Sequence, residues 1–230
     1  MQTKYFPVVT ALIIIVNAVI FVIGILSGEQ IQIIQNYGFI PNHIFNTYDY
    51  GDNNNALQDP LTSLQQSSEL QSPASSSSLS DFVTRLFSSM FIHAGIAHIA
   101  FNLFALAYLG GYAERAIGAP RYILIYFSSG IVAALFHGAI ASYILNNGNV
   151  VLIGASGAIS GVFGIAAVAG NTRAYYWLVL QIAFAVIGSI SVLPIAFTAH
   201  VGGFIAGVLT TKVLVRLEQS KRKSRYFLQP

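Results

Sequence analysis

The stretch VVTALIIIVNAVIFVIGILS, residues 8–27, contains twenty consecutive residues without a charge. A helix that crosses a membrane requires about 20 predominantly apolar residues, whereas the apolar core of a cleaved signal peptide is shorter. Residues 1–27 are therefore expected to hold a short cytoplasmic N-terminus and a retained first transmembrane helix.

The composition of the whole chain also indicates a membrane protein. Hydrophobic residues make up 55% of the 230 residues and charged residues only 8%, with a mean hydropathy of +0.66. A soluble domain carries about 25% charged residues, so the chain is predicted to be an all-α polytopic membrane protein. There is no cysteine, which excludes disulfides, thiol catalysis and cysteine metal sites.

Hydropathy divides the rest of the chain into spans and connections. Five further apolar stretches are expected to cross the membrane, giving a six-transmembrane-helix bundle: about 96–113, 122–145, 155–170, 174–191 and 195–215. The polar connection 28–95 contains a Ser-rich insert, about 51–80, which is expected to be disordered because it cannot bury enough apolar area. Helices two to six (96–215) are expected to carry the active site, and 216–230 forms a basic tail.

The charges then predict the orientation. With six alternating spans, ten of the eleven Lys and Arg residues fall on one side of the membrane, and Arg85 alone falls on the other. By the positive-inside rule both termini are cytoplasmic and the connection 28–95 lies outside. The net charge of +3 thus reflects topology and gives no indication of nucleic-acid binding. The protein is expected to be integral and multi-pass, in the cell membrane if it is prokaryotic.

Polar side chains inside a membrane are costly and are functional candidates. His98 and Asn102 share one face of the second span, Ser156 begins the fourth, and His200 lies in the sixth. Counting at about 1.5 Å per residue from the cytoplasmic ends places Asn102, Ser156 and His200 roughly 18–21 Å above the inner edge. His98 lies about one turn higher, so three spans bring polar groups to one level in the outer half of the bilayer.

Small residues accompany these groups. Gly154-Ala155-Ser156-Gly157 holds a serine between glycines at the start of a helix. Gly157 and Gly161 form a stripe on span four, and Gly203 and Gly207 form another on span six. Such stripes allow helix backbones to approach closely, as a serine and a histidine on different helices require. Read alone, the same glycines are typical of ordinary membrane-helix packing.

The chemistry assigns roles to the polar residues. A serine hydroxyl needs a base, and His200 suits that task for Ser156 near neutral pH. No Asp or Glu occurs between Glu114 and Glu218, so a Ser–His dyad is predicted rather than a triad. His98 and Asn102, with the backbone N–H of Ser156, can donate hydrogen bonds to a developing oxyanion. A structural role as interhelical hydrogen bonds remains the alternative for His98 and Asn102.

Four segments together resemble the rhomboid family of intramembrane serine proteases. They are FIHAGIAHIAFN (91–102), GYAERAIG (111–118), GASGAISG (154–161) and AHVGGFIAG (199–207). The resemblance implies cleavage of single-pass transmembrane protein substrates near the outer face, amid membrane lipids, with Ser156 as nucleophile and His200 as general base. It implies His98 and Asn102 in the oxyanion hole, and neither a metal nor another cofactor. Glu114 and Gly118 belong to the family's cytoplasmic turn.

Two positions depart from the family pattern. Ser160 stands where many members carry an aromatic residue beside the catalytic histidine, and Thr84 stands where many have Trp before Arg85. Two alternative functions stay open: a catalytically inactive rhomboid-like protein that binds membrane clients, and a metal or ion transporter that uses His93, His98 and His200.

Overall fold

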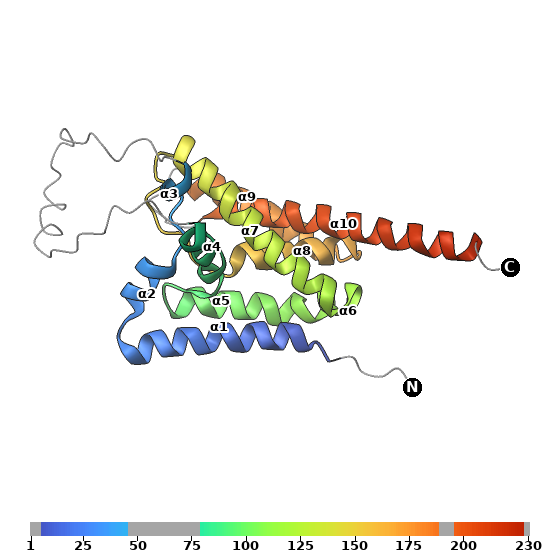
Figure 1. Cartoon of the computed structure of the whole chain (residues 1–230), viewed down its shortest axis with the longest axis horizontal. Helices are drawn as coiled ribbons and strands as arrows, with labels where there is room; N and C mark the ends of the chain where they lie inside the picture. Colours follow the sequence, from blue (N-terminus) through green and yellow to red (C-terminus); the bar gives the residue numbers. More distant parts are fainter. Residues whose placement is uncertain (1–5, 46–78, 189–195, 228–230) are drawn as a thin grey trace, which may run out of the picture.

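The structure is a computed structural model and describes residues 6–45, 79–188 and 196–227 (Figure 1). Helices dominate this part of the chain, and a single isolated β-bridge interrupts them there. The elements are α1 (Val8–Ser27), α2 (Gln30–Tyr37), α3 (Asn42–Phe45), α4 (Leu79–Ser88), η1 (Ser89–Phe91), α5 (Ile96–Ala105), the π-helical turn η2 (Leu106–Gly110), α6 (Gly111–Ile117), α7 (Ala119–Tyr143), α8 (Ser156–Val168), α9 (Arg173–Gly188) and α10 (Phe197–Phe227).

The prediction of an all-α polytopic membrane protein is confirmed. In the described residues, four helices are long and apolar enough to cross a membrane: Val8–Ser27, Ile96–Ile117, Ala119–Tyr143 and Phe197–Lys221. The apolar helix α8 is shorter, with 13 residues. The count of six spans therefore stays a prediction. The Ser-rich insert predicted at 51–80 lies outside the described residues, except for its last two, which begin α4.

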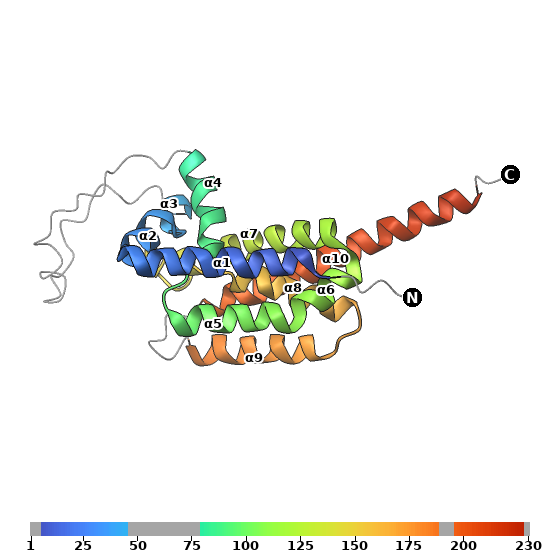
Figure 2. The ribbon, with the colours of Figure 1, turned by 90° about the horizontal axis from the view of Figure 1, so that it is seen from below.

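Helix α8 lies in the middle of the bundle (Figures 1 and 2). Every residue from Gly157 to Ala167 is buried, as expected for a helix that is apolar all round and has neighbours on each side. α8 packs against α7, α9 and α10, while α1 lies along the helix formed by α5, η2 and α6. The fold thus surrounds Ser156, the first residue of α8, with helices from both halves of the chain.

The two glycine stripes face each other across the α8–α10 contact. A Cβ on Gly203 would collide with the carbonyl oxygen of Gly157, and one on Gly207 would lie 2.6 Å from the Cα of Gly161. Real Cβ atoms do not approach other heavy atoms so closely, so these positions require glycine. The missing side chains bring the backbones of α8 and α10 into direct contact, which sets the distance between Ser156 and His200.

Glu114 connects the second long helix to the start of α1. Its buried carboxylate accepts hydrogen bonds from the backbone N–H groups of Val9 and Thr10, at 3.2 and 2.8 Å, and from the Thr10 hydroxyl at 2.8 Å. The first N–H groups of a helix have no partner inside the helix, and a negative charge there also complements the helix dipole. Glu114 thus caps the N-terminus of α1, although Glu114 and Thr10 are 104 residues apart in the sequence. It also belongs to the turn that ends at Gly118.

The connection between α1 and α5 is tied to the loop that precedes Ser156. Phe39 and Leu152 exchange two backbone hydrogen bonds of 3.0 and 2.7 Å, and the N–H of Gly154 donates to the carbonyl of Ser89 at 2.8 Å. Arg85 donates to the carbonyls of Gln35 and Gly38 at the end of α2. The backbone that enters α8 is therefore anchored on two earlier segments of the chain.

The last helix is longer than hydropathy indicates. The sixth span is expected to end near residue 215, but α10 continues to Phe227, so most of the predicted tail is helical. Hydropathy reports where the apolar segment stops, and Lys, Arg, Glu and Gln are good helix formers that continue the helix beyond that point. Glu218 on this extension forms an ion pair with Arg121 at 3.1 Å.

Candidate active site

Ser156 and His200 form a hydrogen bond across the α8–α10 contact. The Oγ of Ser156 lies 2.8 Å from the Nε2 of His200. The histidine is buried, with 8% of its surface exposed, and the serine is half-buried. A nucleophile within hydrogen-bond reach of a base is the geometry that serine catalysis needs. The two residues singled out in the sequence are therefore brought together by the fold.

Gly154 makes room for the imidazole of His98 beside the serine. Its φ of +116° lies in the left-handed region that favours glycine. A Cβ at this position would stand 2.6 Å from the Nε2 of His98 and 3.7 Å from the Oγ of Ser156. Both polar atoms thus border the same small space at the start of α8.

Asn102 lies one turn below His98 on α5 and is buried. Its amide nitrogen donates a hydrogen bond of 2.8 Å to the carbonyl of His98. An asparagine amide has two N–H donors, and this bond uses one of them. The helix-internal bond fixes the side chain in the rotamer that keeps it next to His98.

His93 supports His98 from the segment just before α5. The two imidazole rings lie edge to face, with centroids 4.9 Å apart, and His93 is 1% exposed. Burial, aided by the neighbouring His98, lowers the pKa of His93 to about 4. His93 is therefore neutral near pH 7, and its ring packs against that of His98. The backbone carbonyl of His93 accepts a hydrogen bond of 2.5 Å from the side-chain amide of Gln30.

The structure adds a residue that sequence reasoning missed. The side-chain oxygen of Gln181, on α9, lies 2.6 Å from the Nδ1 of His200. Gln181 is buried, with 4% of its surface exposed. Its signal in the sequence was a polar amide in an apolar span, which normally marks a functional or packing role. The sequence could not show which helix face carries it, so the residue was overlooked.

Aromatic rings reach His200 from positions other than residue 160. The centroid of Phe197 lies 5.9 Å from that of His200, edge to face, and the centroid of Trp177 lies at 6.4 Å. Ser160 itself is buried and donates a hydrogen bond of 2.8 Å to the carbonyl of Ser156. Although residue 160 is a serine instead of the aromatic residue common in the family, rings from α9 and α10 lie next to His200.

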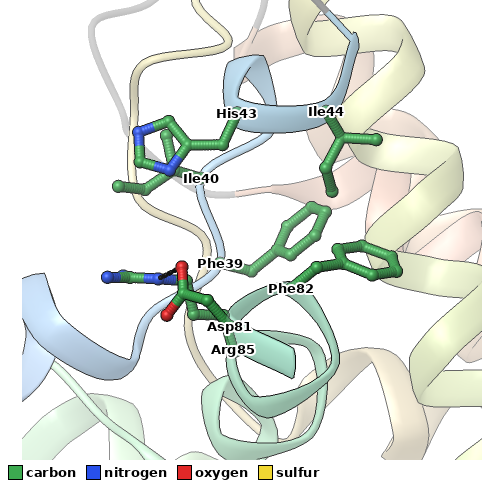
Figure 3. A pocket seen from close by; sticks show the side chains of 7 residues that line it. All are labelled: Phe39, Ile40, His43, Ile44, Asp81, Phe82 and Arg85. Carbon is green, nitrogen blue, oxygen red and sulfur yellow. Dashed lines mark hydrogen bonds and ion pairs between the residues drawn. The ribbon is translucent and has the colours of Figure 1, made fainter. Parts of the chain in front are cut away.

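The remaining two histidines, His137 and His43, have polar neighbours of their own. The Nδ1 of His137, on α7, lies 2.6 Å from the Thr198 hydroxyl, a partner that the sequence did not indicate. His43 lies in a separate hollow between α3 and α4, together with the ion pair Asp81–Arg85 (Figure 3). Burial and the neighbouring Arg85 lower the pKa of His43. Within the described residues, no three His, Asp or Glu side chains gather as a metal site would require.

Comparison with known proteins places the chain in a family. Residues 80–217 match the Rhomboid domain. The YdcA rhomboid protein of Bacillus subtilis (strain 168) is 31% identical over 150 residues, which are 62% of this chain and 70% of that protein. The rhomboid protease GluP of the same organism is 35% identical over 137 residues, which are 56% of this chain and 26% of GluP.

One further relative carries a different description. The inactive RHOMBOID-like protein 8 of Arabidopsis thaliana is 33% identical over 129 residues, which are 55% of this chain and 32% of that protein. The chain thus spans only about a quarter to a third of GluP and of this plant relative. The chain is thus an all-helical membrane protein in which a serine at the start of one helix contacts a histidine on another. The chain belongs to the rhomboid family.

Proposed function

We propose that this chain is an intramembrane serine endopeptidase that cleaves transmembrane-anchored protein substrates near the outer membrane face. The observation that carries the proposal is the 2.8 Å contact between the Oγ of Ser156 and the Nε2 of His200. Its relatives include proteins named rhomboid proteases, such as GluP. Neither a metal nor another cofactor has a role in the proposed reaction.

The reaction follows from the two side chains. The Oγ of Ser156 attacks the carbonyl carbon of the scissile peptide bond, and its proton moves to the Nε2 of His200. When the carbon–nitrogen bond breaks, His200 returns the proton to the leaving amine. Water then hydrolyses the acyl-serine, with His200 again accepting the proton.

Donors for the developing oxyanion lie at the start of α8. The backbone N–H of Ser156 belongs to the first turn, where helix N–H groups have no partner within the helix and the dipole favours negative charge. The Nε2 of His98 lies on the same side, next to Gly154, and the second amide hydrogen of Asn102 is left over from its bond to His98. Each such donor is worth about 10²–10³ in turnover in one soluble protease.

The proposed site lies at the outer end of the bundle. α1 begins and α10 ends at one end of the molecule, and α2 and α4 lie at the other (Figure 1). The Lys and Arg residues of the described helices belong to the first end, except for Arg85 on α4. By the positive-inside rule the first end is cytoplasmic, with both termini. Residues 28–95 are then the outer connection and 216–230 the cytoplasmic extension. The hydrogen bond from the N–H of Gly154 to the carbonyl of Ser89 supports this location of Ser156, because Ser89 belongs to the connection 28–95.

A second candidate is a catalytically inactive member that binds membrane clients. The observation in its favour is the relative named inactive RHOMBOID-like protein 8. The two candidates differ in one measurable property, because only the protease requires the Ser156 hydroxyl.

Cleavage in proteoliposomes tests the proposal. The purified chain is reconstituted with a single-pass model substrate, and products are followed by gel and mass spectrometry. The wild type is expected to cleave near the outer end of the substrate helix, and Ser156→Ala is expected to lose cleavage. Ser128→Ala is the matched control, since that hydroxyl donates only to Ile125 of its own helix. Cleavage by Ser156→Ala at the wild-type rate would overturn the assignment. If the wild type neither cleaves the substrate nor reacts with a fluorophosphonate probe for activated serines, the result would favour the inactive candidate.

A further inference from the structure

We infer that Gln181 is a positioning residue for His200 and acts as the third member of the Ser156–His200 site. The inference rests on the proposed protease function. The sequence predicts a dyad because no Asp or Glu occurs between Glu114 and Glu218. The amide oxygen of Gln181 stands where a carboxylate would stand in a triad, so we infer a Ser–His–Gln arrangement instead of a dyad.

The hydrogen bonds of the imidazole carry the inference. The two ring nitrogens face different partners: Nδ1 lies 2.6 Å from the Oε1 of Gln181, and Nε2 lies 2.8 Å from the Oγ of Ser156. A carbonyl oxygen can only accept, so Nδ1 is the nitrogen that carries the hydrogen. Nε2 then has its lone pair directed at the serine hydroxyl. This is the tautomer that a general base requires, and the opposite tautomer could not take the serine proton.

The packing of α9 holds Gln181 in this position. Trp177 lies one turn before Gln181 on the same face of the helix. Its ring stacks on Phe163 of α8, with centroids 4.6 Å apart and an interplanar angle of 29°. This contact fixes α9 against α8, and the centroid of Trp177 also lies 6.4 Å from that of His200. One face of α9 thus supplies both a ring and an acceptor to the histidine.

The membrane interior favours an amide over a carboxylate at this place. Burying an ionised carboxylate in an apolar medium is far more costly than burying a hydrogen-bonded amide. A neutral amide can still orient an imidazole, as the Cys–His–Asn sites of papain-like proteases do. When His200 takes up the serine proton, the bond from Nδ1 becomes charge-assisted and therefore stronger. Because it strengthens in the transition state, this bond is expected to raise kcat and to leave KM unchanged.

Two substitutions separate positioning from packing. Gln181→Met keeps the length and volume of the side chain but removes the acceptor, and Gln181→Glu keeps an oxygen acceptor at the same reach. In proteoliposomes, kcat of Gln181→Met is expected to fall about 10- to 100-fold, from the strength of hydrogen bonds to charged groups, with KM unchanged. Gln181→Glu is expected to recover part of kcat, because its carboxyl oxygen also accepts from Nδ1, but to lower Tm, because a carboxyl group is more costly to bury there. Ile182→Ala, a neighbouring exposed position on α9, is the matched control and is expected to keep wild-type kcat.

The outcomes distinguish this inference from the proposed function. If wild type and Ile182→Ala cleave and Gln181→Met cleaves equally fast, Gln181 has no positioning role although the protease assignment stands. An equal loss of kcat in Gln181→Met and Gln181→Glu would also overturn the inference, because the presence of an acceptor would then make no difference. Should Gln181→Met fail to fold, Gln181→Leu removes the acceptor with a different shape. A wild type without any cleavage or probe labelling would refute the proposed function, and the inference with it.

Discussion

The carboxylate of Glu114 accepts a hydrogen bond from the backbone N–H of Thr10 and another from its hydroxyl, both at 2.8 Å. Glu114 is fully buried, and the pair joins the first helix of the chain to the end of the second long one. The sequence pattern placed Glu114 in a local turn, so its contact with α1 is the more informative result.

Removing this cap is expected to destabilise the protein. Glu114→Ala leaves the partly buried donor of Val9 and the buried donors of Thr10 without their acceptor, which costs on the order of 2–3 kcal/mol. Glu114→Gln keeps one acceptor oxygen, and its loss is expected to be smaller. Thermal unfolding in detergent measures both variants. Equal Tm values for Glu114→Ala and the wild type would contradict a capping role.

The glycine contact between α8 and α10 gives a second prediction. Gly203→Ala places a Cβ against the carbonyl oxygen of Gly157, so the two helices must separate. Overpacking of this kind costs about 1–3 kcal/mol, and the Ser156–His200 bond is expected to lengthen, which lowers cleavage. Gly95→Ala is the control, because Gly95 has extended backbone and nothing within 4 Å of its Cβ position. Both Tm and cleavage rate are measured; equal behaviour of the two variants would argue against the close contact.

The burial of His93 predicts a dependence of stability on pH. Its pKa in the folded protein is about 4, below the ordinary value of 6.5. As the pH falls from about 6.5 toward 4, the unfolded chain takes up a proton that the folded protein does not, so stability is lost in that window. Stability from this group is complete above pH 6.5.

His93→Gln removes the titrating group and tests this window. The Tm of the wild type is expected to fall more than that of His93→Gln between pH 7 and pH 4.5. His43→Gln is the comparison on a half-buried histidine, where the difference is expected to be smaller. Parallel Tm curves for the wild type and His93→Gln would show that His93 does not titrate in this way.

Arg85 is expected to stabilise the connection 28–95 through its hydrogen-bond geometry as well as its charge. Its Nη1 donates to the carbonyls of Gln35 and Gly38, and its Nε donates to Asp81 at 2.9 Å. A lysine cannot make this set of bonds, because it lacks the planar fork of donors. Arg85→Lys and Arg85→Ala are therefore both expected to lower Tm. For the alanine variant the free energy of unfolding is expected to fall by about 1 kcal/mol. A lysine variant with wild-type Tm would reduce the role of Arg85 to its charge.

Sequence reasoning found the parts of the site that carry a local signature. Ser156 and His200 stand out as polar residues within apolar helices and next to glycine stripes, and the structure places them 2.8 Å apart. The structure also turns the stripes of α8 and α10 toward each other. These features follow from helical spacing and from the cost of polar groups in a membrane.

The features that were missed depend on contacts between distant segments. Glu114 and Thr10 are 104 residues apart, and no periodicity links them. Gln181 was visible as a polar residue in an apolar span, but its partner depends on how α9 is rotated against α10. The true end of α10 was missed because hydropathy marks the membrane boundary, while the helix continues through charged residues to Phe227.

The most direct test of the central claim is labelling of Ser156 by a fluorophosphonate probe in the purified wild type, Ser156→Ala and His200→Ala. The probe reacts with a serine hydroxyl that a base has activated. Mass spectrometry is expected to find the adduct on Ser156 of the wild type, none on Ser156→Ala, and labelling reduced by at least 100-fold on His200→Ala. Labelling of His200→Ala at the wild-type rate, or an adduct on another serine, would contradict the Ser156–His200 pair as the catalytic centre.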